Sequence, residues 1–134
     1  MGCNYYIINE NYRNTVEITD FTNKKFKFKS LPIGIHGGPV EFIHLEQLSS
    51  KIKEDLIEDE NSRIAIITNN SNMLSKYKPL YYNKNNFFIG NVIQAKGLEF
   101  DNVYVLPTGM NLNEEYIAYT RALNKLCIVN GTQT

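Results

Sequence analysis

Short apolar runs recur along the chain, and polar segments separate them. Three of these runs, Arg63–Thr68, Val103–Leu106 and Cys127–Val129, are apolar at nearly every position rather than at alternate positions. That pattern is typical of strands covered on both faces, as in a parallel sheet. Tyr5–Ile8 is a further short apolar run, which is either a first strand or the approach to one. The chain is therefore predicted to build its core around buried strands.

Between these runs, apolar residues recur at helical spacing. Leu45–Glu60 is predicted to form an amphipathic helix that lies on the sheet, because charged residues oppose its apolar positions. A second helix is predicted to begin near Thr15, where Asn14 and Glu17 have the spacing of a capping box. The apolar positions of the Leu45–Glu60 helix are Leu45, Leu48, Ile52 and Leu56.

A third helix is predicted over Glu115–Leu126, with Asn113 as its N-cap. It carries Arg121 in its middle, between the small residues Ala118 and Ala122, which let a helix approach a sheet closely. An arginine at such a packed position either forms a structural ion pair or contacts a ligand. Strands that alternate with helices in this way predict an α/β domain with a mainly parallel central sheet.

Composition limits the class of protein. With 134 residues, 43% of them hydrophobic and 21% charged, the chain can bury one core, so residues 1–134 are predicted to form a single domain. The 14 basic and 14 acidic side chains cancel. The chain therefore has no overall positive field, and contact with nucleic acid would need a local patch or a partner domain.

The cysteines and histidines indicate no metal site. Cys3 and Cys127 form neither a metal pattern nor a disulfide framework, which favours a reduced, intracellular protein. His36 and His44 have no second ligand at metal spacing. No apolar run approaches the ~18 residues of a membrane span, and no signal peptide is visible. We expect a cytoplasmic protein with no membrane partner.

Two segments near the N-terminus have compositions that suggest chemistry. Lys24–Lys29 alternates lysine with phenylalanine, which suits either a strip for single-stranded nucleic acid or an amphipathic strand with one wet face, and we favour the strand. Gly34–Pro39 is glycine-rich and is predicted to be a flexible loop. It is not a Walker A loop, because no Lys-Ser or Lys-Thr pair follows its glycines.

The segment Gln94–Leu106 combines a glycine, a lysine and two carboxylates with the apolar run that follows them. Gly97 permits a backbone shape, or a close approach of a ligand, that a side chain would obstruct. Glu99 is an acceptor suited to a sugar hydroxyl. Lys96 either meets a phosphate or pairs with Asp101, and in the second case the segment is a tight turn with a surface ion pair.

Two polar segments are candidates for ligand contact. Tyr12 and Arg13 place an aromatic ring and a fixed cation before a helix, which suits a stacked base and a gripped phosphate, or else a core tyrosine beside a surface arginine. Asn70 and Ser71 follow the Arg63–Thr68 strand. Their side chains either cap a helix or bind a phosphate of a nucleic-acid backbone.

Three segments resemble known signature motifs. NYRNT at Asn11–Thr15, AKGLEFD at Ala95–Asp101 and YIAYTRA at Tyr116–Ala122 resemble the fourth, fifth and sixth motifs of the UvrD/Rep/PcrA-like superfamily 1 helicases, in the family's order. The resemblance spans roughly Asn11–Val129. It implies a RecA-like (P-loop NTPase-type) three-layer domain, the second of the two motor domains of such a helicase.

The resemblance also implies roles at the nucleotide. Tyr12 matches the tyrosine that stacks on adenine, and Glu99 matches the glutamate that contacts the ribose, in a loop whose close turn is made by Gly97. Arg13 and Arg121 match the two arginines that reach the γ-phosphate, and they are the catalytic candidates.

For DNA, the resemblance implies contacts from Asn70, Ser71, Gln94 and Lys96. This sequence departs from the family at several positions. Asn69 stands where relatives often have an arginine, and Asn91–Ile93 replaces a Thr-x-His pattern, part of whose contact Gln94 is expected to supply. Ser71–Phe88 leaves no room for the large subdomain that many relatives insert, so the resemblance is to the compact branch of the family.

The resemblance thus implies the C-terminal motor half of an ATP-dependent DNA helicase or translocase, moving 3′ to 5′ on single-stranded or duplex DNA. The sequence has no GxxxxGK[ST] loop and no Walker B acidic pair, so an N-terminal motor domain of the same natural chain would complete the site for ATP and Mg²⁺. Hydrolysis is expected of the full-length protein only. Two alternatives remain open: a non-catalytic helicase-like module that binds nucleic acid or protein, and an unrelated α/β domain.

Overall fold

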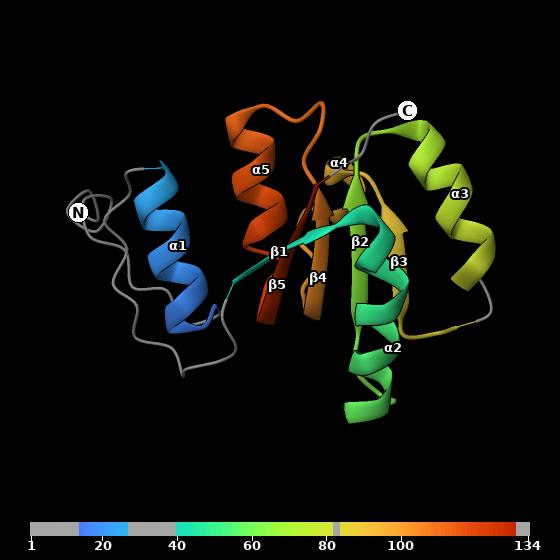
Figure 1. Cartoon of the computed structure of the whole chain (residues 1–134). Helices are drawn as coiled ribbons and strands as arrows, with labels where there is room; N and C mark the ends of the chain where they lie inside the picture. The colour runs from blue at the N-terminus through green and yellow to red at the C-terminus, as the bar shows by residue number, and fades with distance from the viewer. Residues whose placement is uncertain (1–13, 27–39, 82–83, 131–134) are drawn as a thin grey trace.

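The computed structural model describes residues 14–26, 40–81 and 84–130 (Figure 1). These residues form a three-layer α/β domain, in which a five-stranded, all-parallel sheet in the order β1-β5-β4-β2-β3 lies between two sets of helices. The fold class expected from the sequence is confirmed. The strands are β1 (Glu41–His44), β2 (Ile64–Thr68), β3 (Phe87–Gly90), β4 (Phe100–Leu106) and β5 (Ala122–Asn130).

Helices cover both faces of the sheet. α1, α4 and α5 pack on one face, around a core that includes Ile18, Val92 and Ala118. α2 and α3 pack on the other face, around a core that includes Ile52 and Met73. The helices are α1 (Val16–Phe26), α2 (Leu48–Glu58), α3 (Ser71–Tyr81), α4 (Val92–Ala95) and α5 (Leu112–Tyr119), with a short 3₁₀ turn, η2 (Leu45–Gln47), before α2.

The predicted buried strands are confirmed, and the apolar pattern explains their positions. β2 lies inside the sheet and is buried at all five of its residues, while β4 begins three residues before the predicted Val103–Leu106. The edge strands β1 and β3 were not predicted from the sequence. Each has only four residues. β1 alternates polar and apolar positions in part, and the apolar run of β3 is too short, between asparagine-rich segments, to have been identified as a strand.

The predicted helix over Leu45–Glu60 is confirmed as η2 followed by α2. Leu48 and Ile52 are buried, and Leu45 and Leu56 pack against the same core. His44 lies at the start of η2, where its backbone N–H donates to Gln47 Oε1 at 2.8 Å. His44 thus occupies an ordinary helix-start position.

The predicted helix over Glu115–Leu126 is wrong in its second half. α5 ends at Tyr119, and β5 begins at Ala122. Alanine, leucine and lysine favour a helix locally, but tertiary pairing overrides such weak preferences. Here the chain from Ala122 to Ile128 pairs in parallel with β4, which is buried and needs partners for its backbone.

Two predicted caps are also corrected. The N-cap of α5 is Asn111 rather than Asn113: Asn111 Oδ1 accepts from the Glu114 N–H at 2.8 Å, and Glu114 Oε1 accepts from the Asn111 N–H at 3.0 Å. α1 begins as predicted, but Thr15 Oγ1 accepts the N–H of Ile18 at 3.3 Å, while the amide of Asn14 donates elsewhere.

The predicted strand over Lys24–Lys29 is wrong where it can be compared, because Lys24–Phe26 is the last turn of α1. Several other predictions lie outside the described residues, namely those at Cys3, Tyr5–Ile8, Tyr12, Arg13, Lys27–Lys29 and Gly34–Pro39, with His36 in the last of these. Within the part of the chain that the structure describes, no helix combines the length and the apolar character needed to cross a bilayer.

Candidate functional site

The predicted site residues lie at two opposite edges of the sheet. Lys96, Gly97 and Glu99 come directly before β4, and Arg121 comes directly before β5, so all four lie at the edge where these parallel strands begin. Asn70 and Ser71 follow β2, at the edge where the strands end. Ligands of open α/β sheets usually bind at the second of these edges. The group around Arg121 is therefore a separate site.

Arg121 sits just beyond the end of α5 and joins it to the loop before β4. Its Nε donates to the carbonyl of Ile117 at 2.9 Å, and its Nη1 donates to the carbonyl of Leu98 at 3.2 Å. Its Nη2 lies 3.2 Å from Thr120 Oγ1. A cation at a helix C-terminus is favourable, because the last carbonyls carry partial negative charge. With 9% of its surface exposed, Arg121 also holds the loop against α5.

Asn14 brings the start of α1 to the same place. Its Nδ2 donates to the carbonyl of Thr120 at 3.0 Å and to the carbonyl of Ala122 at 2.6 Å, so one side-chain amide binds the residues on both sides of Arg121. Asn14 is 3% exposed. Buried carbonyls are costly when they lack a donor, so these two bonds strongly favour this arrangement.

A second contact holds α1 against α5. Lys25 Nζ lies 3.5 Å from Glu115 Oε1, and the same oxygen accepts from the hydroxyl of Tyr119 at 3.0 Å. Burial raises the pKa of Tyr119, and the hydrogen bond to Glu115 adds to this effect. Tyr119 therefore stays neutral as a donor at physiological pH, and α1 is anchored at both ends of α5.

Gly97 gives the loop before β4 its shape. Its φ is +85°, a conformation that residues with side chains rarely adopt. A Cβ at this position would meet no heavy atom within 4 Å. The requirement for glycine here is therefore conformational, which selects the first of the two reasons considered from the sequence.

Glu99 lines a shallow hollow beside Gly97. The hollow has a volume of about 320 Å³ and is bordered on its other side by Arg63 and Asn86. Of the two roles considered for Lys96, the pairing with Asp101 does not form. Asp101 Oδ2 instead accepts from the backbone N–H of Arg63 at 2.8 Å, and it lies 3.8 Å from Arg63 Nε. This contact ties the start of β2 to the start of β4.

Asn70 caps α3, the first of the two roles considered for it. Its Oδ1 accepts from the backbone N–H groups of Asn72 at 2.8 Å and Met73 at 3.1 Å. Ser71 is exposed at the start of the same helix. The neighbouring Asn69 accepts from the Val92 N–H at 3.2 Å and so links the end of β2 to α4.

Gln94 and Lys96 lie in and just after α4. Gln94 closes a capping box with Asn91: its Oε1 accepts from the Asn91 N–H at 3.0 Å, and its own N–H donates to Asn91 Oδ1 at 2.8 Å. Lys96 is exposed. The Asn91-x-x-Gln94 spacing is a capping signal that could have been read from the sequence.

The structure thus brings together three segments that lie far apart in the chain. Asn14, Leu98 and Arg121 meet through hydrogen bonds, while Tyr12 and Arg13 precede Asn14 but lie outside the described residues. Asn14 and the Arg63–Asp101 pair were missed by sequence reasoning. No local pattern marks a contact between residues more than 30 positions apart, so only the fold reveals them.

Comparison with solved structures finds proteins of similar fold. The chain is similar to the crystal structure of the C-terminal domain of a possible DNA helicase from Lactobacillus plantarum WCFS1, with a TM-score of 0.60. The two chains share their fold. Sequence identity is 21%, and the match covers 89% of this chain and 86% of that chain. No protein-family model matches the chain, and a search of curated proteins gives no match.

Proposed function

We propose that this chain is the C-terminal motor half of an ATP-dependent DNA helicase or translocase. Three lines of support converge on this function. The fold is shared with the C-terminal domain of a possible DNA helicase. Three segments resemble motifs four, five and six of UvrD/Rep/PcrA-like helicases and occur in the family's order. Finally, the parts of these segments that the structure describes lie side by side.

This last observation carries the proposal. The NYRNT segment ends at Asn14 and Thr15, and Asn14 binds the carbonyls on both sides of Arg121. The guanidinium of Arg121 binds the carbonyl of Leu98, next to Glu99 in the AKGLEFD segment. Accidental matches in an unrelated α/β domain would have no reason to meet at one edge of a sheet.

In the proposed mechanism, the chain supplies half of a nucleotide pocket. Tyr12 stacks on adenine, Glu99 binds the ribose, and Arg13 and Arg121 bind the γ-phosphate. An N-terminal motor domain of the natural chain supplies the Walker A loop, the activated water and the carboxylates for Mg²⁺. Arg121 would exchange one or more of its present hydrogen bonds for the phosphate when the two halves close, and would stabilise charge in the transition state.

DNA would lie along residues at both edges of the sheet. Asn70, Ser71 and Gln94, at the edge where the strands end, and Lys96, in the segment before β4, would contact its backbone. Closure on ATP and opening after hydrolysis would move the two motor halves relative to each other. That motion is translocation, with a 3′ to 5′ direction taken from the resemblance.

The test uses the full-length natural protein and its DNA-stimulated ATPase rate. Arg121→Lys keeps the charge but loses the forked donor geometry. We expect it to lower kcat by about a hundredfold or more, because an arginine finger is worth about a thousandfold or more. Lys24→Gln, which removes an exposed charge from α1, should leave the rate unchanged.

Arg121 also supports the fold, so its substitution could lower the ATPase rate by destabilising the protein. Thermal unfolding of each variant separates the two effects. Glu99→Gln provides a second measurement, since it keeps the shape of the side chain and removes its charge. It should raise KM for ATP with little change in thermal stability. A normal ATPase rate in folded Arg121→Lys would defeat the assignment of Arg121.

The alternative of a non-catalytic binding module has one observation in its favour. All three nitrogens of the Arg121 guanidinium already have partners within the protein, at Ile117, Leu98 and Thr120. A purely structural arginine would have such bonds. On this alternative, Arg121→Lys lowers the unfolding temperature, and nucleotide hydrolysis is undetectable in the wild-type protein.

A further inference from the structure

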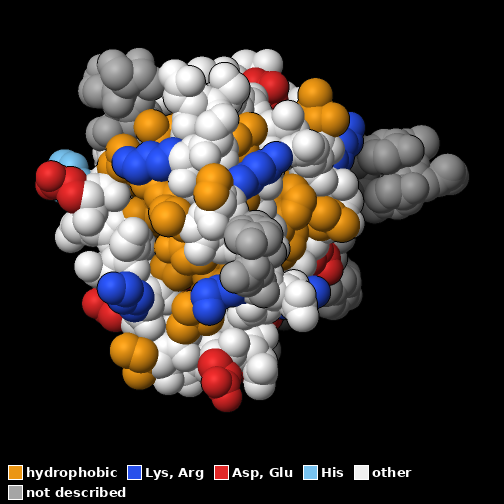
Figure 2. Space-filling view, turned by 90° about the vertical axis from the view of Figure 1, so that its right-hand side faces the viewer, with side chains coloured by type: hydrophobic (Ala, Val, Ile, Leu, Met, Phe, Trp, Pro, Cys, Tyr) orange, Lys and Arg blue, Asp and Glu red, His pale blue; other side chains and the backbone are white. Residues whose placement is uncertain are grey.

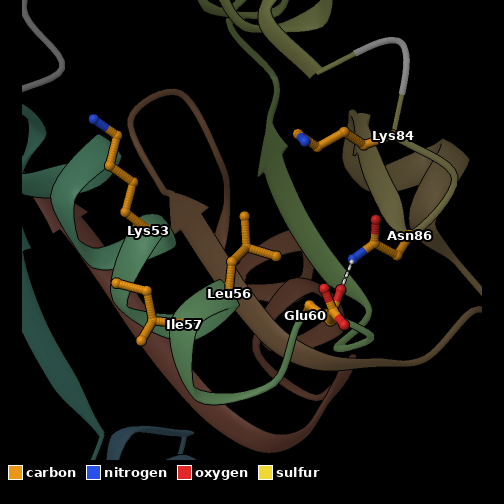
Figure 3. Close-up of a pocket in the computed structure, with 6 residues that line it drawn as sticks. All are labelled: Lys53, Leu56, Ile57, Glu60, Lys84 and Asn86. Carbon is orange, nitrogen blue, oxygen red and sulfur yellow. Dashed lines mark hydrogen bonds between the residues drawn. The ribbon is translucent and has the colours of Figure 1, made fainter.

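The end of the sheet at β3 carries a groove made of two adjoining hollows. One hollow, of about 620 Å³, is lined by the end of α2 and the segment before β3, with Lys53 and Lys84 on opposite sides of Leu56 (Figure 3). The other hollow, of about 240 Å³, is lined by Lys78, Tyr81, Lys84, Phe87 and Ile89. Lys84 lines both hollows, so they adjoin at this residue. We call this surface the β3 groove.

Positive charge in the β3 groove is not neutralised. Lys53, Lys78 and Lys84 form no ion pair with any residue that the structure describes. Glu60 is the one acidic residue among the described residues that line the two hollows. Figure 2 views this end of the molecule and shows lysine and arginine side chains interleaved with hydrophobic ones, while acidic side chains lie mostly toward the margin.

Aromatic and aliphatic side chains lie between these lysines. The rings of Tyr81 and Phe87 stack with centroids 4.5 Å apart and an interplanar angle of 4°. Lys78 is three residues before Tyr81 on α3, and therefore lies on the same side of the helix. Ile57 is 86% exposed at the rim of the larger hollow.

Backbone contacts fix the shape of the groove. The Lys84 N–H donates to the carbonyl of Tyr81 at 3.0 Å, and the Phe87 N–H donates to the carbonyl of Lys84 at 3.3 Å. These two hydrogen bonds hold Lys84 beside the stacked rings. Asn86 Nδ2 donates to the carbonyl of Ser62 at 2.7 Å, which fastens the segment before β3 to the start of β2.

From this arrangement we infer that the β3 groove binds single-stranded nucleic acid, with Lys53, Lys78 and Lys84 on phosphates and the Tyr81–Phe87 pair against a base. Lysines complement a chain of phosphates, and exposed aromatic faces stack on bases of any sequence. An acidic peptide would use the lysines but not the planar apolar surface. The groove adjoins the hollow beside Glu99, with which it shares Asn86 and Phe87, but its three lysines and the ring of Tyr81 are not among the residues assigned to ATP or to the DNA contacts above. This inference therefore does not depend on ATP hydrolysis.

The experiment measures binding of fluorescein-labelled dT20 to the full-length protein without nucleotide, by fluorescence anisotropy at several salt concentrations. Lys78→Gln combined with Lys84→Gln should weaken binding about tenfold and flatten the slope of log K against log salt by about 1.4, since each phosphate contact on a single strand contributes about 0.7. Tyr81→Leu should weaken binding about tenfold with an unchanged salt slope.

The matched control for Lys84→Gln alone is Lys24→Gln, which leaves the contact of Lys25 with Glu115 in place. It removes the same charge from α1, which lies at the opposite end of the molecule from β3 (Figure 1). Its affinity and salt slope should equal those of the wild type. Thermal unfolding confirms that each variant is folded. If the groove variants and the α1 variant bind dT20 equally well, the inference is wrong.

Competition distinguishes the other occupants. Unlabelled dT20 and rU20 should each displace the probe, and their ratio shows whether the groove prefers DNA or RNA. Polyglutamate of equal charge should displace it at least tenfold less well, and equal displacement would overturn the inference in favour of an acidic peptide. Light scattering shows whether the protein dimerises. A dimer that is lost in the Lys78→Gln, Lys84→Gln double variant would instead assign the groove to a second copy of the chain. Loss of the ATPase activity measured without DNA, in any variant, bears on the proposed function alone.

Discussion

Lys125 Nζ lies 2.8 Å from Oδ1 of Asp55, an α2 aspartate whose side chain is only 3% exposed. The hydroxyl of Tyr104 donates to the other oxygen of the same carboxylate. A charged pair and a tyrosine thus join α2 to β4 and β5. Burial strongly raises the pKa of Tyr104, and the bond to Asp55 adds to this effect.

Asp55→Ala should therefore destabilise the domain by about 3–5 kcal/mol, because it leaves the buried hydroxyl of Tyr104 without its acceptor and Lys125 with only the longer contact to Glu41, at 3.9 Å. The free energy of unfolding in urea measures this loss. Glu54→Ala provides the control on the same helix: Glu54 is exposed, and its substitution should change stability by about 0.5 kcal/mol or less. A loss below about 1 kcal/mol for Asp55→Ala would show that the pair contributes little.

Glu41 should make the stability of the domain depend on pH. Burial alone would raise its pKa, but the nearby ammonium groups of Lys51, at 3.0 Å, and Lys125, at 3.9 Å, outweigh burial and hold the pKa below the ordinary 4.5. A carboxyl whose pKa is lowered on folding stabilises the fold above its ordinary pKa, and this contribution is lost as pH falls through the folded value. Glu41→Gln should therefore be less stable than wild type at pH 7. The difference should shrink steadily below pH 4.5, and a constant difference across that range would contradict this account.

Cys127 should be chemically inert in the folded protein. Burial raises the pKa of its thiol to about 12, so almost no thiolate exists at pH 8. In a Cys3→Ser variant, a thiol reagent such as DTNB should react slowly or not at all under native conditions, and completely in urea. Rapid labelling of the native variant would mean that the β4–β5 core opens far more readily than its packing indicates.

The stability cost of a substitution at Gly97 should depend only on how readily the new residue adopts a positive φ. Gly97→Ala should cost about 1 kcal/mol because φ is positive, although the added Cβ meets no neighbour. Gly97→Asn should cost less, since asparagine adopts this conformation more readily. Urea unfolding measures both variants. Gly109, with φ +86° and equal space, is a matched site where the same order is expected.

Asn14 should be essential to the junction around Arg121. Asn14→Asp keeps the size of the side chain but replaces its two donors with acceptors that face the carbonyls of Thr120 and Ala122. The expected loss of unfolding free energy is about 2–3 kcal/mol, for two lost bonds and two unsatisfied carbonyls. Asn113→Asp, at an exposed position on α5, should be nearly neutral. Equal stability of the two variants would remove the structural basis for grouping the three motifs.

Several elements could be predicted from local pattern because local physics decides them. Continuous apolar runs identified β2 and the core of β4, since only a strand buried on both faces has that pattern. Apolar spacing identified α2. The short edge strands β1 and β3 bury too little surface to be recognised as strands from their sequences.

The boundary between α5 and β5 shows where local pattern fails. The residues after Tyr119 have ordinary helix propensity, and the sequence gives no sign that the helix stops there. β5 exists because β4 is buried and its backbone groups need partners along the whole register from Phe100 to Val105. That need arises only once the sheet has formed.

By itself, the sequence determined which chemical groups the site contains: a glycine and a glutamate before one strand, and an arginine that it placed within a helix. Only the tertiary structure decided that these groups share one edge of the sheet, and that Asn14 holds them together across more than 100 residues. Hydrogen bonds from an amide or a guanidinium are directional and need carbonyls at fixed places. Those places exist only where β4 and β5 lie side by side.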